Sequence, residues 1–186
     1  MPDTVDGLPL HPLLVHLPLV LVPMLVLLLL AYVLIPPLRR RVGWAVVILA
    51  VLAPVAVFFT RWTGKSFADS IIAGTSGAAP ATPEKAEQIA EHGMFGDWLL
   101  WLTIAVLPLT LLFGGLERGR RSARARADRP FAKKEGEDAP PKPIDDPAAG
   151  GRKLFMVVIG VLLIATAAAA GYVAFKSGHT GAKTHW

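Results

Sequence analysis

The chain alternates long uncharged apolar runs with shorter polar segments. Four runs, at 12–35, 42–60, 98–114 and 154–175, contain no Asp, Glu, Lys or Arg. A bilayer core of about 30 Å needs roughly 17 to 25 such residues in a helix, so each run has the length of one transmembrane helix. Four helices that are apolar on all sides would leave a soluble protein of this length with almost no polar surface. The pattern therefore predicts an all-α integral membrane protein, folded as an up-and-down four-helix bundle.

Composition agrees with this class. Of the 186 residues, 53% are hydrophobic and only 18% are charged, which is more apolar than soluble proteins usually are. The absence of cysteine excludes disulfides, thiolate metal ligands and thiol nucleophiles within the chain. The first apolar run is too long for a signal peptide, and Asp3 and Asp6 precede it where a signal peptide would carry positive charge. We therefore expect the first helix to remain in the mature protein.

The polar segments define the domain organisation. Residues 1–115 should contain helices one to three with an outer loop at 61–93, and residues 154–186 should contain helix four and an outer C-terminal tail. Residues 116–153 combine an arginine cluster, mixed charges and five prolines with few large apolar side chains. Such a composition is typical of disorder, so we expect a disordered loop there. No internal repeat is visible in the sequence.

The basic residues predict the orientation. Three arginines at 39–41 and eleven Lys or Arg at 116–153 make 14 of the 19 basic residues, and they lie in the two connections on one side. The other side carries the remaining five, which are Arg61, Lys65, Lys85, Lys176 and Lys183. Because cytoplasmic loops carry the excess of Lys and Arg, both termini should lie outside the cytoplasm.

This orientation gathers every histidine at the outer face. The five are His11, His16, His92, His179 and His185. His16 should lie about one turn inside helix one, roughly 6 Å below its mouth, where a polar ring needs a partner. It could be a ligand of a cofactor. Alternatively, the ring could only bond a backbone carbonyl that Pro12 or Pro18 leaves without its amide donor.

The leading functional hypothesis is a haem b site. Histidines are the usual axial ligands in helical bundles, and helices one and three can lie across the core from each other. His16 and His92 then form the expected axial pair, with Arg61 and Lys65 available to the haem propionates.

The variant of this hypothesis is a copper or zinc centre. It would use three or four of His11, His16, His92 and His179, with Met94 as a possible soft ligand. Either cofactor makes the chain a membrane subunit for electron transfer, whose partners would be the lipid bilayer and redox proteins, and no nucleic acid. The competing class is a non-redox scaffold or accessory subunit without a cofactor. An enzyme is less favoured, because no nucleophile–base pair or paired carboxylates occur in the apolar runs.

The histidine segments also carry a family resemblance. Residues 11–18 read HPLLVHLP and resemble the HPxxVHxP opening of the bacterial DUF2231 membrane proteins, and residues 178–182 read GHTGA, similar to their closing GHxGA segment. Thr63-Gly64 and His92 also fit that family's pattern. The resemblance implies a four-helix domain of unknown function in the bacterial cytoplasmic (inner) membrane, which sometimes accompanies redox modules such as Rieske-type proteins. Its recurring histidines match His11, His16, His92 and His179, whereas His185 has no counterpart.

Overall fold

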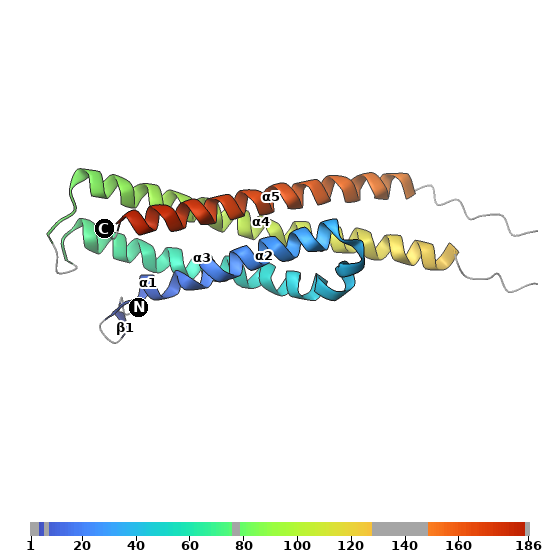
Figure 1. Ribbon diagram of the computed structural model, residues 1–186, viewed down its shortest axis with the longest axis horizontal. Coiled ribbons are helices and arrows are strands. Elements are labelled where there is room, and N and C mark those ends of the chain that lie inside the picture. The colour runs from blue at the N-terminus through green and yellow to red at the C-terminus, as the bar shows by residue number, and fades with distance from the viewer. Residues whose placement is uncertain (1–3, 6–7, 76–78, 128–148, 185–186) are drawn as a thin grey trace, which may run out of the picture.

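The structure, a computed structural model, describes residues 4–5, 8–75, 79–127 and 149–184. Apart from one short pair of strands, these residues are mostly helical (Figure 1). The elements in chain order are β1 (Thr4–Val5), β2 (Leu8–Pro9), α1 (Leu10–Leu14), α2 (His16–Leu34), the 3-10 turn η1 (Pro36–Leu38), α3 (Arg39–Ile72), α4 (Pro83–Ala127) and α5 (Ala149–Thr184).

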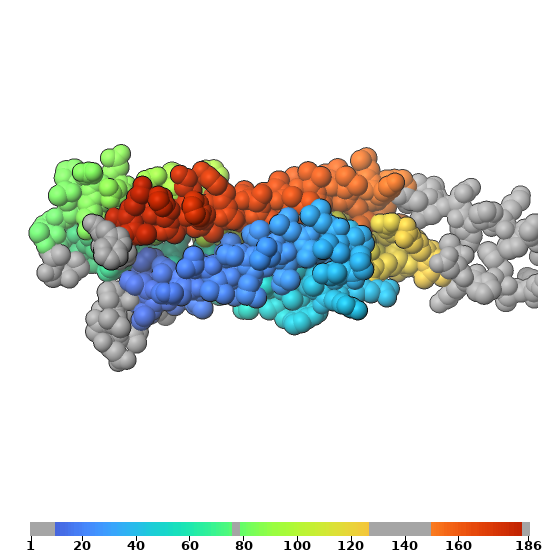
Figure 2. Space-filling model, viewed as in Figure 1, coloured from blue at the N-terminus to red at the C-terminus, as the bar shows by residue number. Residues whose placement is uncertain are grey.

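The four long helices α2 to α5 form an up-and-down bundle, as the apolar runs predict. α2 packs against α3 and α5, and α4 packs against the same two helices, so α2 and α4 lie across the core from each other. α2 and α5 lie side by side on the face that Figure 2 shows. Both chain ends and the connection between α3 and α4 lie at one end of the bundle, and the turn η1 lies toward the other (Figure 1).

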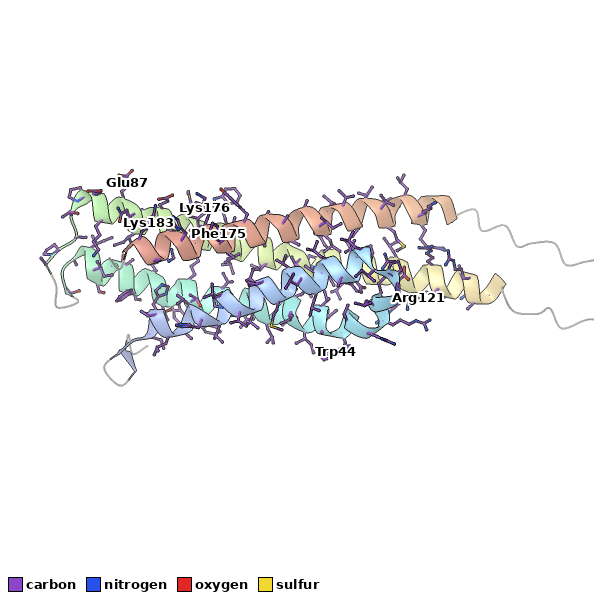
Figure 3. All side chains as sticks on the ribbon, in the orientation of Figure 1. Trp44, Glu87, Arg121, Phe175, Lys176 and Lys183 are labelled. Carbon is purple, nitrogen blue, oxygen red and sulfur yellow. The ribbon has the colours of Figure 1, made fainter. Side chains whose placement is uncertain are left out.

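The outer surface of the bundle is apolar, as a membrane protein requires. Four of the described helical segments are long and apolar enough to cross a membrane, and only 22–33% of each apolar window is buried inside the bundle. Trp44 projects from its side and is 67% exposed (Figure 3). Such large apolar side chains would be costly in water but match lipid, so the chain is a multi-pass membrane protein.

The core between the helices is closely packed. Its centre consists of aliphatic and aromatic side chains, including Val22, Leu25, Leu163 and Phe113. Fully buried alanines on α3 and α5 let these helices approach their neighbours closely, which is the usual basis of helix association in membranes. They are Ala50, Ala53, Ala167 and Ala170.

The helices are longer than the apolar runs, which corrects the expected loop boundaries. The outer loop expected at 61–93 starts later than expected, because α3 continues to Ile72. Its second part is helical from Pro83, where Thr82-Pro83 predicts the start of a short helix at 83–91, and α4 begins there. The 116–153 segment is helical up to Ala127 and again from Ala149, and its residues 128–148 lie outside the described part of the chain. The expected C-terminal tail continues α5 to Thr184. Bilayer thickness sets the length of the apolar part of a helix only. Once a helix has formed, each further residue adds one backbone hydrogen bond, so the helix can continue into the polar residues beyond the apolar run.

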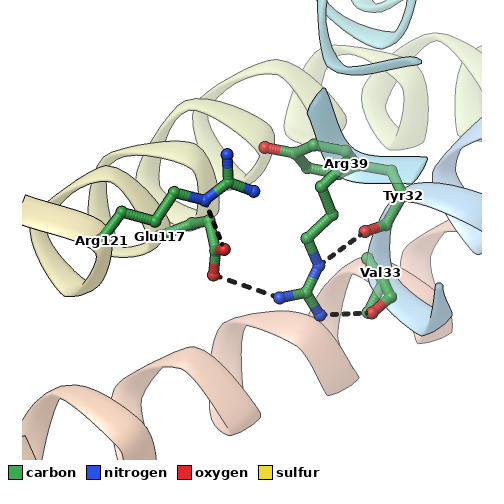
Figure 4. A network of polar contacts seen from close by, with 5 residues as sticks. All are labelled: Tyr32, Val33, Arg39, Glu117 and Arg121. Atoms are coloured by element: carbon green, nitrogen blue, oxygen red, sulfur yellow. Dashed lines mark hydrogen bonds and ion pairs between the residues drawn. The ribbon is translucent and has the colours of Figure 1, made fainter. Parts of the chain in front are cut away.

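A polar network fastens the end of the bundle where α2 turns into α3 (Figure 4). The Arg39 guanidinium donates to the backbone carbonyls of Tyr32 (3.0 Å) and Val33 (2.8 Å), and to the Glu117 carboxylate on α4 (3.1 Å). Arg121 donates to the other oxygen of that carboxylate at 2.8 Å. Arg39 therefore satisfies carbonyls at the end of α2 and links three helices through one side chain.

Candidate functional site

The described histidines lie together at one end of the bundle, as the sequence predicts. His11 lies on α1, His16 begins α2, His92 lies near the start of α4 and His179 near the end of α5. This is the end that carries the chain termini and the α3–α4 connection (Figure 1). His185 lies outside the described residues.

His11 is fixed against α3. Its Nδ1 lies 2.9 Å from the carbonyl oxygen of Thr60, and its ring stands 6.0 Å from the ring of Phe67. The ring also lies directly over Gly64, where an added Cβ would come within 2.7 Å of the imidazole Cε1. Glycine at this position therefore leaves the space that the imidazole fills.

His92 is fixed against α5 in the same manner. Its Nδ1 lies 3.0 Å from the carbonyl oxygen of Ser177 and 3.3 Å from the hydroxyl of Thr180. The ring lies over Gly181, where an added Cβ would come within 2.9 Å of Cε1. The Thr180 hydroxyl also donates to carbonyls of its own helix, so its lone pairs face the imidazole.

These hydrogen bonds define the protonation of both rings. A backbone carbonyl can only accept, so Nδ1 of His11 and of His92 must carry the proton that each donates. In a neutral imidazole the lone pair then belongs to Nε2. Donation of the other ring N–H to a backbone carbonyl is the usual arrangement around a metal-ligating histidine, because it fixes the tautomer and the ring orientation.

The two fixed rings face each other across the core. The ring centroids of His11 and His92 are 6.2 Å apart, and the ring planes are inclined by 77°. The expected partner of His92 was His16, and the structure instead places His11 next to it. His16 is exposed, and its Nδ1 lies 3.4 Å from the Leu13 carbonyl, which neither Pro12 nor Pro18 deprives of its helical donor.

Helical periodicity contains the signal that singles out His11. The buried positions of α2 are Pro18, Val22, Leu25, Leu29 and Tyr32. His11 lies two turns before Pro18 and so has the same angular position as this face, and it is partly buried. His16 lies only two residues before Pro18, at a different angle, and is exposed. His92 lies two turns before the buried Leu99 on α4 in the same way. The expected depth of His16 in the membrane had favoured it as the partner of His92. The helix face on which each histidine lies explains why His11 takes that place.

A cavity of about 800 Å³ surrounds the histidine pair. Residues from α1 to α5 line it, most of them apolar or glycine. Its lining includes the residues predicted to bind haem, which are His16, His92, Arg61 and Lys65, together with His11 and Met94. His179 is not among the lining residues, since it is exposed and stacks on Phe175 with 6.2 Å between the ring centroids.

Three charged side chains, those of Arg61, Lys65 and Asp97, line this cavity. Arg61 on α3 forms an ion pair with Asp97 on α4, and Lys65 follows Arg61 one turn later. Asp97 is a site residue that was not predicted from the sequence. Its position directly before the uncharged run at 98–114 could have indicated it, because an isolated acid at the edge of a membrane-spanning run needs a cationic partner.

The four predicted metal ligands do not all converge. Within the described part of the chain, no three His, Asp or Glu side chains are grouped as a metal ion would require. Of His11, His16, His92 and His179, the first and third come together. The geometry therefore resembles a two-ligand site more than the three- or four-histidine site of the copper or zinc variant.

Comparison of the chain with protein-family models, with curated proteins and with solved structures gives no match. The DUF2231 resemblance thus stays a prediction based on the motif residues. A function for the chain has to be inferred from the geometry of its own residues.

Proposed function

We propose that the protein is a membrane subunit that binds haem b near one face of the bilayer and serves in electron transfer. His11 and His92 are the axial ligands in this proposal. The observation that carries it is the pairing of these two rings, each anchored through Nδ1–H to a backbone carbonyl of a neighbouring helix. With Nδ1 anchored in this way, Nε2 of each ring would be the ligating atom.

The separation of the rings supports two axial bonds to one iron. With Fe–N bonds of about 2 Å and about 1.1 Å from each nitrogen to its ring centroid, axial imidazoles should stand about 6 Å apart, centroid to centroid. The observed distance is 6.2 Å. This agreement supports His11 and His92, which are far apart in the sequence, as the two residues that would hold the iron.

The surroundings suit a porphyrin. A cavity of about 800 Å³ is within the size range of sites that hold small cofactors, and its mostly apolar lining matches the porphyrin ring. Arg61 and Lys65 lie on one side of it and would pair with the propionates. In this role Arg61 would share its charge between Asp97 and a propionate.

The proposal includes a location. The 14-to-5 division of basic residues supports an orientation in which the histidine end faces away from the cytoplasm. The DUF2231 resemblance supports the bacterial cytoplasmic membrane. Haem at the outer face would exchange electrons with redox proteins there.

Copper is the second candidate, because Met94 lines the same cavity as the two histidines. Imidazole and thioether ligands are a combination that Cu(I) accepts. Copper and haem would use the same pair of rings and are distinguished by their spectra.

An absorption spectrum of the purified protein tests the proposal. We expect a Soret band that shifts on reduction, present in His179→Ala and lost in His11→Ala and in His92→Ala. Metal analysis that finds copper and no haem would replace haem by the second candidate. A folded protein without haem or copper, after expression with haem precursor and copper supplied, would overturn the cofactor function and leave the scaffold hypothesis.

A further inference from the structure

The two histidine contacts have the same form. His11 bonds the carbonyl of Thr60 and lies over Gly64, and His92 bonds the carbonyl of Ser177 and lies over Gly181. In both helices the glycine follows the bonded carbonyl by one turn, and a threonine precedes the glycine. One turn of α3 and one turn of α5 thus present the same structure to a histidine.

The correspondence extends along α2 and α4. The interval that separates His11 from His92 also separates each buried residue of α2 from a buried residue of α4. The pairs are Pro18 and Leu99, Val22 and Thr103, Leu25 and Val106, Leu29 and Thr110, and Tyr32 and Phe113. Five matches at one interval mean that the two helices present the same face to the core.

α3 and α5 correspond in the same manner. The interval from Gly64 to Gly181 also separates Val46 from Leu163, Ala50 from Ala167, Ala53 from Ala170 and Ala56 from Val173, all of them buried. It also relates two aromatic contacts on the helix surfaces, Phe58 with Trp62 and Phe175 with His179. The repeat is hard to see in the residue types, because most of the equivalent core positions carry different residues.

The opposite end of the bundle repeats the relation. Tyr32 packs on Gly43, and its counterpart Phe113 packs on the corresponding Gly160. The two aromatic rings meet edge to face with 5.4 Å between their centroids, as the two imidazoles meet at the other end. Equivalent residues can touch each other only close to a symmetry axis, so these two contacts mark where the axis passes.

We infer that the chain is a tandem pair of equivalent helical hairpins, α1–α3 and α4–α5, related by a pseudo-two-fold axis along the bundle. Gly64 and Gly181 are equivalent positioning residues that hold His11 and His92 at that axis. The hairpins run in the same direction through the membrane, which makes them parallel repeats. The ligand role of the two rings rests on the proposed function, whereas the equivalence of the glycines does not.

The symmetry explains why glycine is needed twice in helices where it is otherwise unfavourable. An added methyl group at either position would overlap the imidazole, and the ring would have to turn or leave its carbonyl. His16 corresponds to Asp97, and His179 corresponds to Trp62. Neither of these histidines has an equivalent histidine, which agrees with their places outside the pair.

The test is a double-mutant cycle on stability, read by thermal unfolding in detergent without added cofactor. Gly64→Ala should lower Tm by on the order of 3 °C or more in the wild-type chain and have no such effect in His11→Ala. Gly181→Ala should behave identically with respect to His92→Ala. Crossed pairs, such as Gly64→Ala in His92→Ala, should couple more weakly than these own pairs. Gly115→Ala and Gly171→Ala are controls, because an added Cβ meets nothing within 4 Å at the first and stays at 3.8 Å or more from its neighbours at the second.

A spectroscopic readout separates positioning from packing. In haem-loaded protein, both glycine variants should change the low-spin EPR signal of the iron by similar amounts, because each turns one ring. The control variants should leave it unchanged. Glycine variants that couple no more strongly to their own histidine than to the other would overturn the inference even if haem binds. Strong own-pair coupling in a protein that binds no haem would uphold the repeat and reject the proposed function alone.

Discussion

The hydroxyl of Thr60 on α3 donates a 3.1 Å hydrogen bond to the carbonyl of Leu14, the last residue of α1. Pro18 has no amide hydrogen, so this carbonyl lacks the donor that a helix normally supplies four residues later. Thr60 also accepts the Nδ1–H of His11 at its own carbonyl. One residue therefore compensates the proline and orients the histidine.

Thr60→Val should destabilise the protein by about 1–3 kcal/mol, because it removes the hydroxyl and leaves a part-buried carbonyl without a donor. Thr60→Ser keeps the hydroxyl and should remain close to wild type. Unfolding in detergent measures both. Equal stability of the valine and serine variants would show that the Leu14 carbonyl needs no donor.

Arg39→Met should destabilise the protein by about 3 kcal/mol. It removes one of the two guanidinium partners of the Glu117 carboxylate, which is only 13% exposed, and it leaves two carbonyls of α2 without their donor. Arg39→Lys should recover little, since an ammonium cannot reproduce the planar set of donors. Arg40→Met is the matched control on an exposed neighbour and should change stability by less than about 0.5 kcal/mol. The network would lose its assigned role if the two methionine variants unfolded alike.

Cysteine labelling can test the orientation, since the chain contains no cysteine. Glu87→Cys and Arg124→Cys place single thiols at exposed positions toward opposite ends of α4. A membrane-impermeant maleimide added to intact cells should label the first and should reach the second only after permeabilisation. The reverse result would move the histidine end to the cytoplasm.

The angle between the two imidazoles predicts the type of EPR signal. If His11 and His92 hold haem as proposed, each ring would interact mainly with the iron d orbital that lies perpendicular to the plane of that ring, and rings inclined by 77° would affect two such orbitals almost equally. The oxidised haem should therefore give a highly anisotropic low-spin signal. A rhombic signal, as parallel rings produce, would mean that the rings rotate when haem binds.

The four helices were predictable because each apolar run can be recognised locally in the sequence, and its length can be compared directly with the thickness of a bilayer core. The extension of α3 to Ile72 was not, because the residues beyond Thr60 are polar enough to suit a loop equally well. The network at Arg39 was also missed. In the sequence Arg39 is one of three clustered arginines that indicate topology, and nothing local indicates that Glu117 lies beside it.

The site was predictable in part. Arg61, Lys65, His16 and His92 do line one cavity, as expected. The pairing of His11 with His92 depends on which faces of α1 and α4 meet, and on the small residues Gly64 and Gly181 that admit the rings. Those facts belong to the packing of four helices together, so single-helix reasoning about depth could not supply them.

The dense packing between Val22 and Phe113 has a consequence for the direction of electron flow. The cavity lies at the histidine end, and beyond it the described core consists of apolar side chains together with Thr103 and Thr110. A cofactor held by His11 and His92 would thus be backed by a layer that acts as an electrical insulator through most of the bilayer. If the proposed cofactor is bound there, electrons would enter and leave on the same side, and the protein would carry them along the membrane surface instead of across the bilayer.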